Sequence, residues 1–199
     1  MLTTSAFILL AAGIMTHAGL DGPESGSVVF NEFMAHPLAS ATETEGEWIE
    51  FYNKSGDWIN LSGWKIVNHQ GEEIVLSSYL LPPESFFVIG ASGDETRNGG
   101  YTPDFVYCSF SIDDIDELTL QGRTAVVSDH IDFDGTWDVI PGHSCERINP
   151  GWVSNIASSW AHAFLSFGDG DQGTPGFINS VYQNSFAQNT WAFIKAFSQ

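Results

Sequence analysis

Three glutamates near the start of the chain are of a type that could support acid–base chemistry. Glu32 lies in one apolar run, and Glu47 and Glu50 belong to a second. General acid–base catalysis needs two carboxyl groups that face one cleft and differ in pKa. The sequence supplies no nucleophile or oxyanion-hole motif beside them, and no P-loop or dinucleotide fingerprint. We therefore interpret the three as strand carboxylates that hydrogen-bond nearby backbone groups, and we expect no catalytic residue.

A polar loop near the end of the chain suggests a second chemistry, the binding of a hard cation. Asp169 and Asp171 flank a glycine, and carboxylates at this spacing suit calcium. The loop lacks the later glutamate of an EF-hand, so an Asx-turn leading to Pro175 is the competing interpretation. Calcium, with Asp169 and Asp171 as ligands, is thus the one cofactor that the sequence suggests.

The chain has two cysteines, Cys108 and Cys145, which allow a single intramolecular disulfide. Whether that bridge forms depends on the compartment. His143 and Cys145 would share one face of a strand, but one such pair is at most half of a zinc site. We therefore expect no zinc site and leave the disulfide open.

Three tryptophans, Trp58, Trp137 and Trp152, lie in or beside predicted turns. Exposed aromatic rings can stack on sugars or on partner proteins, whereas the alternative is packing at the core or at a corner. These tryptophans are the candidate ligand contacts of the sequence.

Short apolar runs between turn residues must position all these side chains. The chain has 20 glycines, 8 prolines and 43% hydrophobic residues, which favours an all-β protein with a substantial core. The segments expected to be strands are residues 28–34, 47–53, 59–66 with a break, 74–76, 86–89, 105–110, 117–120, 125–127, 131–133, 144–148 and 159–163. Their number and spacing predict a β-sandwich.

One of these runs changes phase. Ile59 and Leu61 are apolar at odd positions, whereas Trp64 and Ile66 are apolar at even positions. A period of two cannot change phase unless the backbone takes up an extra residue. Gly63 lies at the change and can adopt a positive φ, so we predict a turn or bulge at this glycine and the residue before it.

Both ends of the chain differ from this pattern. Residues 1–18 resemble a secretory signal, because a short uncharged apolar run precedes a small-residue cleavage site. No basic residue lies near Met1, so an uncleaved apolar arm or an N-terminal strand is the alternative. Residues 19–27 have the composition of a linker. Residues 180–199 carry apolar residues at spacing three, which indicates a short, helical tail that either packs on the domain or meets a partner.

The formal net charge of −19, from 25 acidic and 6 basic residues, limits the classes of partner. Such a surface repels phosphate, so we expect no nucleic-acid binding and no docking on anionic lipid. No segment of the mature chain is long and apolar enough to span a membrane. The signal predicts a secreted or cell-surface protein, in which a bridge between Cys108 and Cys145 would be reasonable.

Several motifs, taken in order, resemble the lamin tail domain family. The opening signature is matched by Asn31-Glu32, by residues 47–53 and by Leu61-Ser62-Gly63-Trp64, and later matches are residues 81–89, 110–120, 144–147 and 173–179. The resemblance covers residues 28–179 and implies an immunoglobulin-like β-sandwich with no agreed catalytic activity. Exported bacterial members of the family often accompany hydrolase or nuclease domains. This chain departs from the family at Cys145, where leucine is usual, and in the long tryptophan-bearing loop after Phe133.

These observations predict an exported, non-catalytic binding or scaffolding module that contacts a protein or a cell-surface glycan. The alternative is a calcium-dependent extracellular hydrolase, or an accessory domain of one.

Overall fold

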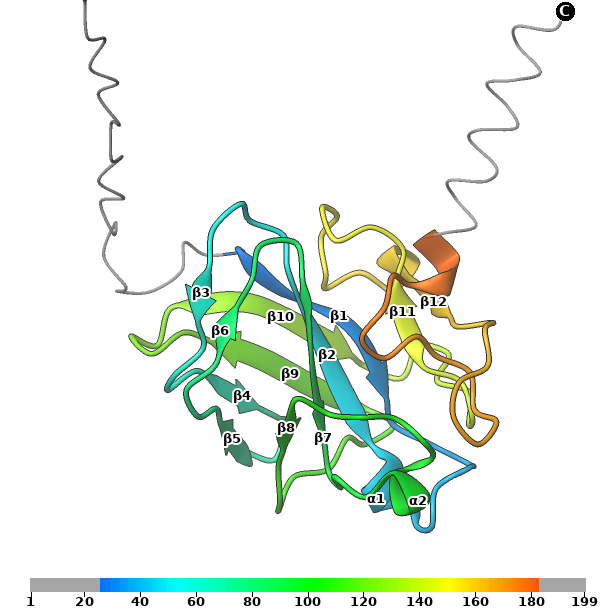
Figure 1. Ribbon diagram of the computed structural model, residues 1–199. Helices are drawn as coiled ribbons and strands as arrows, with labels where there is room; N and C mark the ends of the chain where they lie inside the picture. The colour runs from blue at the N-terminus through cyan, green and yellow to red at the C-terminus, as the bar shows by residue number, and fades with distance from the viewer. Residues whose placement is uncertain (1–25, 183–199) are drawn as a thin grey trace, which may run out of the picture.

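Two β-sheets lie face to face over a shared core in the computed structural model, which describes residues 26–182 (Figure 1). The larger sheet has the strand order β12-β11-β1-β2-β7-β8. In that order its strands are Trp160–His162, Cys145–Arg147, Val28–Met34, Trp48–Asn53, Phe86–Gly90 and Phe105–Val106. All its neighbours are antiparallel except β7 and β8, which are parallel.

The second sheet has four strands in the order β10-β9-β4-β5. In that order they are Val127–Phe133, Asp116–Gln121, Lys65–Val67 and Glu73–Val75. A separate pair joins β3 (Ile59–Asn60) to β6 (Leu80–Leu81), and the short helices are α1 (Glu43–Gly46), α2 (Glu95–Asn98) and the 3-10 turn η1 (Ala157–Ser159). No helix within residues 26–182 has the length and apolar character needed to cross a membrane. The prediction of an all-β sandwich is confirmed.

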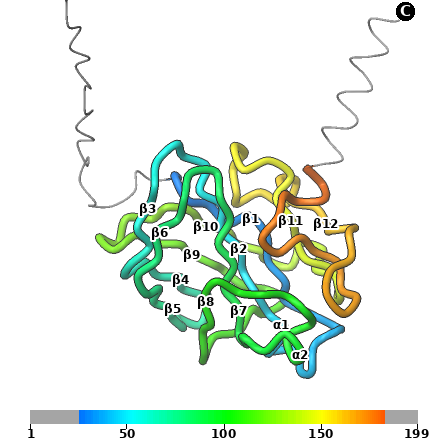
Figure 2. The backbone as a smooth tube through the Cα atoms, in the orientation of Figure 1, coloured from blue at the N-terminus to red at the C-terminus, as the bar shows by residue number. Residues whose placement is uncertain are grey.

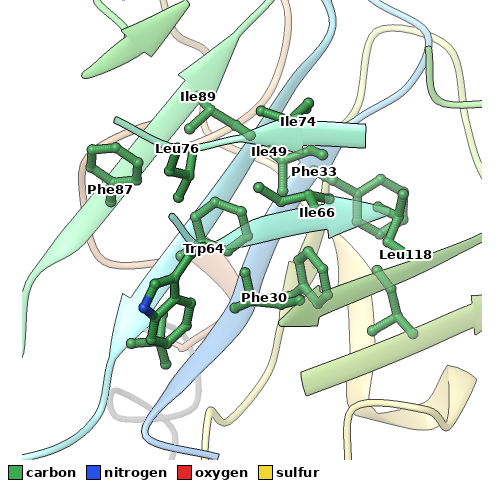
Figure 3. Close-up of a cluster of buried hydrophobic side chains, with 14 of the residues drawn as sticks. Phe30, Phe33, Ile49, Trp64, Ile66, Ile74, Leu76, Phe87, Ile89 and Leu118 are labelled. Atoms are coloured by element: carbon green, nitrogen blue, oxygen red, sulfur yellow. The ribbon is translucent and has the colours of Figure 1, made fainter. Parts of the chain in front are cut away.

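The core lies between the two sheets (Figure 3). Phe30, Phe33 and Ile49 from the larger sheet face Ile66 and Leu118 from the smaller one, and all five are at most 1% exposed. Burying a side chain of this size stabilises a fold by about 1.5–3 kcal/mol. The core therefore provides the main driving force that holds the sheets together.

A second apolar cluster covers the outer face of the larger sheet. Trp48, Met34, Val88 and Tyr101 are buried there, and Phe167 packs on them from a later loop. This cluster explains the continuous apolar run of β7, since neighbouring residues of a strand point to opposite faces.

Strand β1 contains a bulge that the sequence analysis did not identify. Phe30 and Phe33 both enter the core although they are three residues apart, and the register between β1 and β2 shifts between Phe30 and Glu32. The backbone N–H of Phe30 donates to the carboxylate of Asp129 on β10, at 2.9 Å. The bulge therefore turns this amide away from the ladder and ties the two sheets together.

The predicted turn at Gly63 is confirmed. Gly63 has φ +77°, and the N–H of Trp64 donates to the carbonyl of Leu61 at 3.0 Å. The turn lets Leu61 and Trp64 both reach the core.

The expected strand at residues 105–110 is mostly wrong, because only β8 is regular there. The N–H of Tyr107 donates to the carbonyl of Gly90, and Ser109 then takes a left-handed φ of +58°. A left-handed residue ends a strand, and sequence alternation does not report it. The predicted boundaries of the domain, 28–179, stay a prediction, and the predicted signal and most of the linker and tail lie outside the described residues.

The last described segment returns to the larger sheet after β12. We call residues 172–181 the closing segment. In Figure 2 this part of the chain, drawn in orange, lies beside β11. In the closing segment, the side-chain amide of Asn179 donates to the backbone carbonyl oxygens of Asn31 on β1 and Arg147 on β11, at 3.0 and 2.9 Å.

Candidate functional site

Three glutamates form a row across the outer face of the larger sheet. Glu32 on β1 is the direct cross-strand partner of Glu50 on β2 and of Glu146 on β11. Direct partners in neighbouring strands present their side chains on the same face. All three side chains are 0% exposed. We call these three residues the glutamate row.

The closing segment lies over the glutamate row and donates hydrogen bonds to each member. Glu32 accepts from the backbone N–H of Thr174 at 2.8 Å, and Glu50 accepts from that of Gly176 at 2.6 Å. Glu146 accepts from the backbone N–H groups of Ser180 and Val181, at 3.0 and 2.9 Å. The closing segment does not pair with a strand, so these carboxyl groups accept the backbone hydrogen bonds that the carbonyl groups of a neighbouring strand would otherwise accept.

One hydroxyl group connects two of these carboxyl groups. Thr174 Oγ1 lies 2.8 Å from an oxygen of Glu32 and 2.8 Å from an oxygen of Glu146. A hydroxyl group has one hydrogen, so it can donate to only one of the two carboxyl groups. The other contact is a hydrogen bond when that carboxyl group is protonated and donates to the hydroxyl oxygen.

Burial favours the protonated forms of Glu32 and Glu50. Burial, followed by the charge of Glu146, raises the pKa of Glu32 to about 8, against the opposing effect of hydrogen bonds from Ser144 and Thr174. Burial, followed by the charge of Glu32, raises the pKa of Glu50 well above its usual range. Carboxyl groups with raised pKa values can act as general acids where a substrate reaches them. Here the closing segment covers them, so their geometry suits a structural role.

Glu47, the third glutamate considered from the sequence, lies apart from the row. It precedes β2 and accepts from the backbone N–H of Ile112 at 3.1 Å. Burial raises its pKa to about 8, and the hydrogen bond from Ile112 opposes this. The structure thus brings together Glu32 and Glu50 but not Glu47. Sequence reasoning missed Glu146 as a member of the row, although its segment carries part of the family resemblance.

Two asparagines extend the row. Asn31, in the bulge of β1, donates to Glu50 at 2.7 Å and to the side-chain oxygen of Asn179 at 2.6 Å. Both asparagines are at most 3% exposed. The bulge therefore positions Asn31 for contact with the closing segment. The bulge in β1 and the path of the closing segment thus depend on each other.

A buried ion pair lies on the inner side of the same strands. Arg147 Nη1 is 3.0 Å from Asp129 and also donates to the carbonyl of Phe30. Arg147 also donates to the carbonyl of Trp152, and Ser154 donates to Asp129. Removing one member of such a pair leaves a buried charge, which is strongly destabilising. The pair therefore fixes the loop that carries Trp152.

The acidic loop predicted to bind calcium has another role in the structure. Asp171 is 5% exposed, and its carboxylate accepts from the backbone N–H groups of Leu38 and Ala39 at 3.0 and 3.1 Å. Asp169 is exposed, and its own N–H donates to the carbonyl of Gly99. Within residues 26–182 no three His, Cys, Asp or Glu side chains are grouped to hold a metal ion. Asp171 therefore holds the loop at Leu38 and Ala39 in place. Calcium binding stays a prediction that this geometry does not support.

The disulfide left open by the sequence is not formed. Both thiols are free: Cys145 is buried in the core on β11, whereas Cys108 is exposed just after β8. Strands β11 and β8 are separated by β1, β2 and β7, and neighbouring strands lie about 4.8 Å apart. That separation exceeds the Cα distance of about 4.4–6.8 Å that a disulfide requires.

The three candidate tryptophans separate into two kinds. Trp58 is 59% exposed and Trp152 is 50% exposed. The loops that carry them, after β2 and after β11, lie at the same end of the sandwich (Figure 1). Trp137 instead packs with ring centroids 5.9 Å from Phe133 and 5.6 Å from Trp160. Trp137 belongs to the edge of the core, which corrects its assignment as a ligand contact.

Two hollows that sequence reasoning did not identify flank the closing segment. The larger has a volume of about 800 Å³ and the smaller about 240 Å³. Glu84 and Phe86 line both of them. Residues 175–177 border the larger hollow and Ile178 borders the smaller, so the closing segment lines both of them.

Comparison with known proteins gives one match. The lamin tail domain family model matches residues 22–135, which is more than half of the chain. No curated protein matches the sequence. The matched range includes the strands from β1 to β10, whereas β11, β12 and the closing segment follow it.

Proposed function

The chain belongs to the lamin tail domain family of immunoglobulin-like domains, and on that premise we propose that it is an exported, non-catalytic binding or scaffolding module. Domains of this family are usually non-catalytic and of a protein-interaction type. Export rests on the signal predicted at residues 1–18.

The observation that carries this proposal is the burial of the glutamate row. A substrate would have to displace the closing segment before it could reach Glu32 or Glu50, because both are 0% exposed. Displacement would also break the hydrogen bonds that Thr174 and Gly176 donate. The residues best suited to acid–base chemistry are therefore engaged in holding the fold.

The exposed loops support contact with a protein or a surface glycan. The loops that carry Trp58 and Trp152 lie at one end of the sandwich (Figure 1), and about half or more of each side chain is exposed. Tryptophan is enriched among the residues that dominate binding energy at interfaces, and its face also suits sugar rings. The ion pair of Arg147 and Asp129 holds the second of these loops in place before any partner binds, which lowers the entropy cost of binding.

Retention experiments test the proposal. The immobilised chain is exposed to extracellular proteins and to a glycan array, and bound material is compared with that of a Trp58→Ala/Trp152→Ala variant. We expect the double variant to lose most of the retained partner, with its melting temperature unchanged within a few degrees. Trp137→Ala is the matched control: it should lower the melting temperature, because Trp137 packs on Phe133 and Trp160.

Two results would favour the calcium-dependent hydrolase instead. The first is hydrolysis by the chain that Glu50→Gln abolishes while the protein stays folded. The second is a rise in melting temperature in millimolar calcium that Asp171→Asn removes, since a ligand of the native state stabilises it.

A further inference from the structure

We propose that the two hollows beside the closing segment form one groove that binds a basic peptide segment of the partner, through its lysine or arginine side chains. This inference rests on the proposed function, because it names the class of partner that the binding module would take.

The groove has two walls from distant parts of the sequence. One wall is the turn before β7, which carries Glu84, together with Phe86 at the start of that strand, and the other is the closing segment. Phe177 stands at the rim with 72% of its side chain exposed. A volume of about 800 Å³ in the larger hollow falls within the range of roughly 300–1,000 Å³ typical of ligand sites.

The charged side chains exposed in the groove are acidic. The larger hollow is lined by Glu84 and Asp104 and by no basic residue. The one basic residue at the smaller hollow, Arg147, is only 2% exposed, and its guanidinium is paired with Asp129. With a net charge of −19 on the whole chain, the groove attracts cationic groups and repels acidic ones.

Aromatic faces accompany the carboxylate. The rings of Tyr52 and Phe86 have centroids 5.1 Å apart at the smaller hollow. Glu84 lines the same hollow as these rings, and its charge, after burial, raises the pKa of Tyr52. A carboxylate beside an aromatic face suits a guanidinium or ammonium group, which can pair with the one and stack on the other.

The backbone at Glu84 adds an independent observation. Glu84 has φ +53°, in the left-handed region that glycine adopts at no steric cost. For other residues a left-handed conformation costs about 1–2 kcal/mol. The turn therefore carries strain that glycine would relieve, and the Glu84 side chain that lines both hollows gives this strain a function.

Charge also selects the occupant. Two copies of this chain would bring acidic surfaces of equal charge together, which is unfavourable. A basic peptide has the opposite charge, and its long side chains can reach past Phe177 toward Glu84. The groove thus fits a basic segment better than a second copy.

A peptide titration tests this inference. The full chain is titrated with a fluorescent peptide of glycine, serine and four arginines, and fluorescence anisotropy gives the Kd at low and at physiological salt. We expect saturable binding. Glu84→Gln should raise the Kd about tenfold, which corresponds to about 1.4 kcal/mol of binding free energy. Phe177→Ala should also raise the Kd. Glu73→Gln on β5, in the other sheet, is the matched control and should bind like the original chain.

A second variant separates binding from folding. Glu84→Gly should relieve the backbone strain and keep or raise the melting temperature, yet it should lose binding as Glu84→Gln does. A peptide with glutamates in place of the arginines should not bind.

Three outcomes would overturn the inference. Equal losses in Glu84→Gln and Glu73→Gln would mean diffuse attraction to an acidic protein. Self-association that Phe177→Ala abolishes would make a second copy the occupant. Trp191 is one of the apolar residues at spacing three in the C-terminal tail. Peptide binding that appears only after Trp191→Ala would mean that the tail of the chain itself competes for the groove. None of these results bears on the retention experiment above, so failure of this inference is distinguishable from failure of the proposed function.

Discussion

Glu32 is fully buried, and Ser144 and Thr174 donate hydrogen bonds to its carboxyl oxygens. A strand carboxylate that satisfies backbone N–H groups was predictable from the residue type and from the absence of a catalytic motif. Its partner Thr174 was not predictable, because it lies 142 residues away and sequence periodicity reports only local structure. The same limit hid Glu146, which joins the row through pairing between strands distant in the sequence.

Substitutions at Glu32 should distinguish hydrogen bonding from packing. At pH 5 we expect Glu32→Gln to unfold with nearly the same free energy as the original chain, because an amide can accept and donate as a protonated carboxyl group does. Glu32→Leu should lose about 3 kcal/mol, since it leaves the polar groups of Thr174 and Ser144 buried without an acceptor.

Urea unfolding at pH 5 measures the free energy of unfolding of both variants. The control is Glu73→Leu on the exposed edge strand β5, which should differ from the original chain by no more than about 1 kcal/mol. Equal losses in Glu32→Gln and Glu32→Leu would show that the hydrogen bonds of Glu32 do not support the fold.

At the scale of elements, alternation and turn residues predicted most of the strands. The phase change at Gly63 located the turn between β3 and β4. The bulge in β1 was less visible, because only Asn31 and Glu32 separate Phe30 from Phe33 and no glycine marks the shift. The end of β8 was missed for a similar reason, since Ser109 adopts its left-handed φ without being a glycine.

The turn at Gly63 allows a controlled test of backbone conformation. Gly63→Ala should lower the free energy of unfolding by about 1–2 kcal/mol, because φ is +77° and the added Cβ would lie 3.3 Å from the side chain of Arg123. Gly56→Ala is the matched control, because no atom lies within 4 Å of its added Cβ and its φ is not positive.

Thermal or urea unfolding of the two alanine variants gives the comparison. If Gly56→Ala and Gly63→Ala had the same effect, the phase change in this run would need another explanation.

At the scale of the whole molecule, the acidic chain keeps some of its carboxyl groups inside. The family match reaches residue 135, whereas the row is completed by Glu146 on β11 and covered by the closing segment, which both follow that range. A return of the chain across the sheet depends on long-range packing, so the sequence motifs indicated this segment without locating it. The central claim is that Glu32 and Glu50 are protonated in the folded protein and that the row is structural, which leaves binding to the surface.

The dependence of stability on pH tests this claim most directly. The native pKa of Glu32 is raised by burial to about 8, whereas the ordinary pKa of a glutamate is 4.5. Between these values the native state holds a proton that the unfolded chain has released, so the stability that Glu32 contributes is complete below about pH 4.5 and is lost as pH rises to about 8.

The measurement is the free energy of unfolding of the original chain and of Glu32→Gln at intervals from pH 4.5 to 9, with Glu73→Gln as the control for general charge. We predict that the original chain loses stability relative to Glu32→Gln across this window, by up to about 1.4 kcal/mol per pH unit, and that the difference is constant above about pH 8. A difference that stays constant throughout, or one in which the original chain gains stability as pH rises, would show that Glu32 is ionised in the folded protein and would contradict the account.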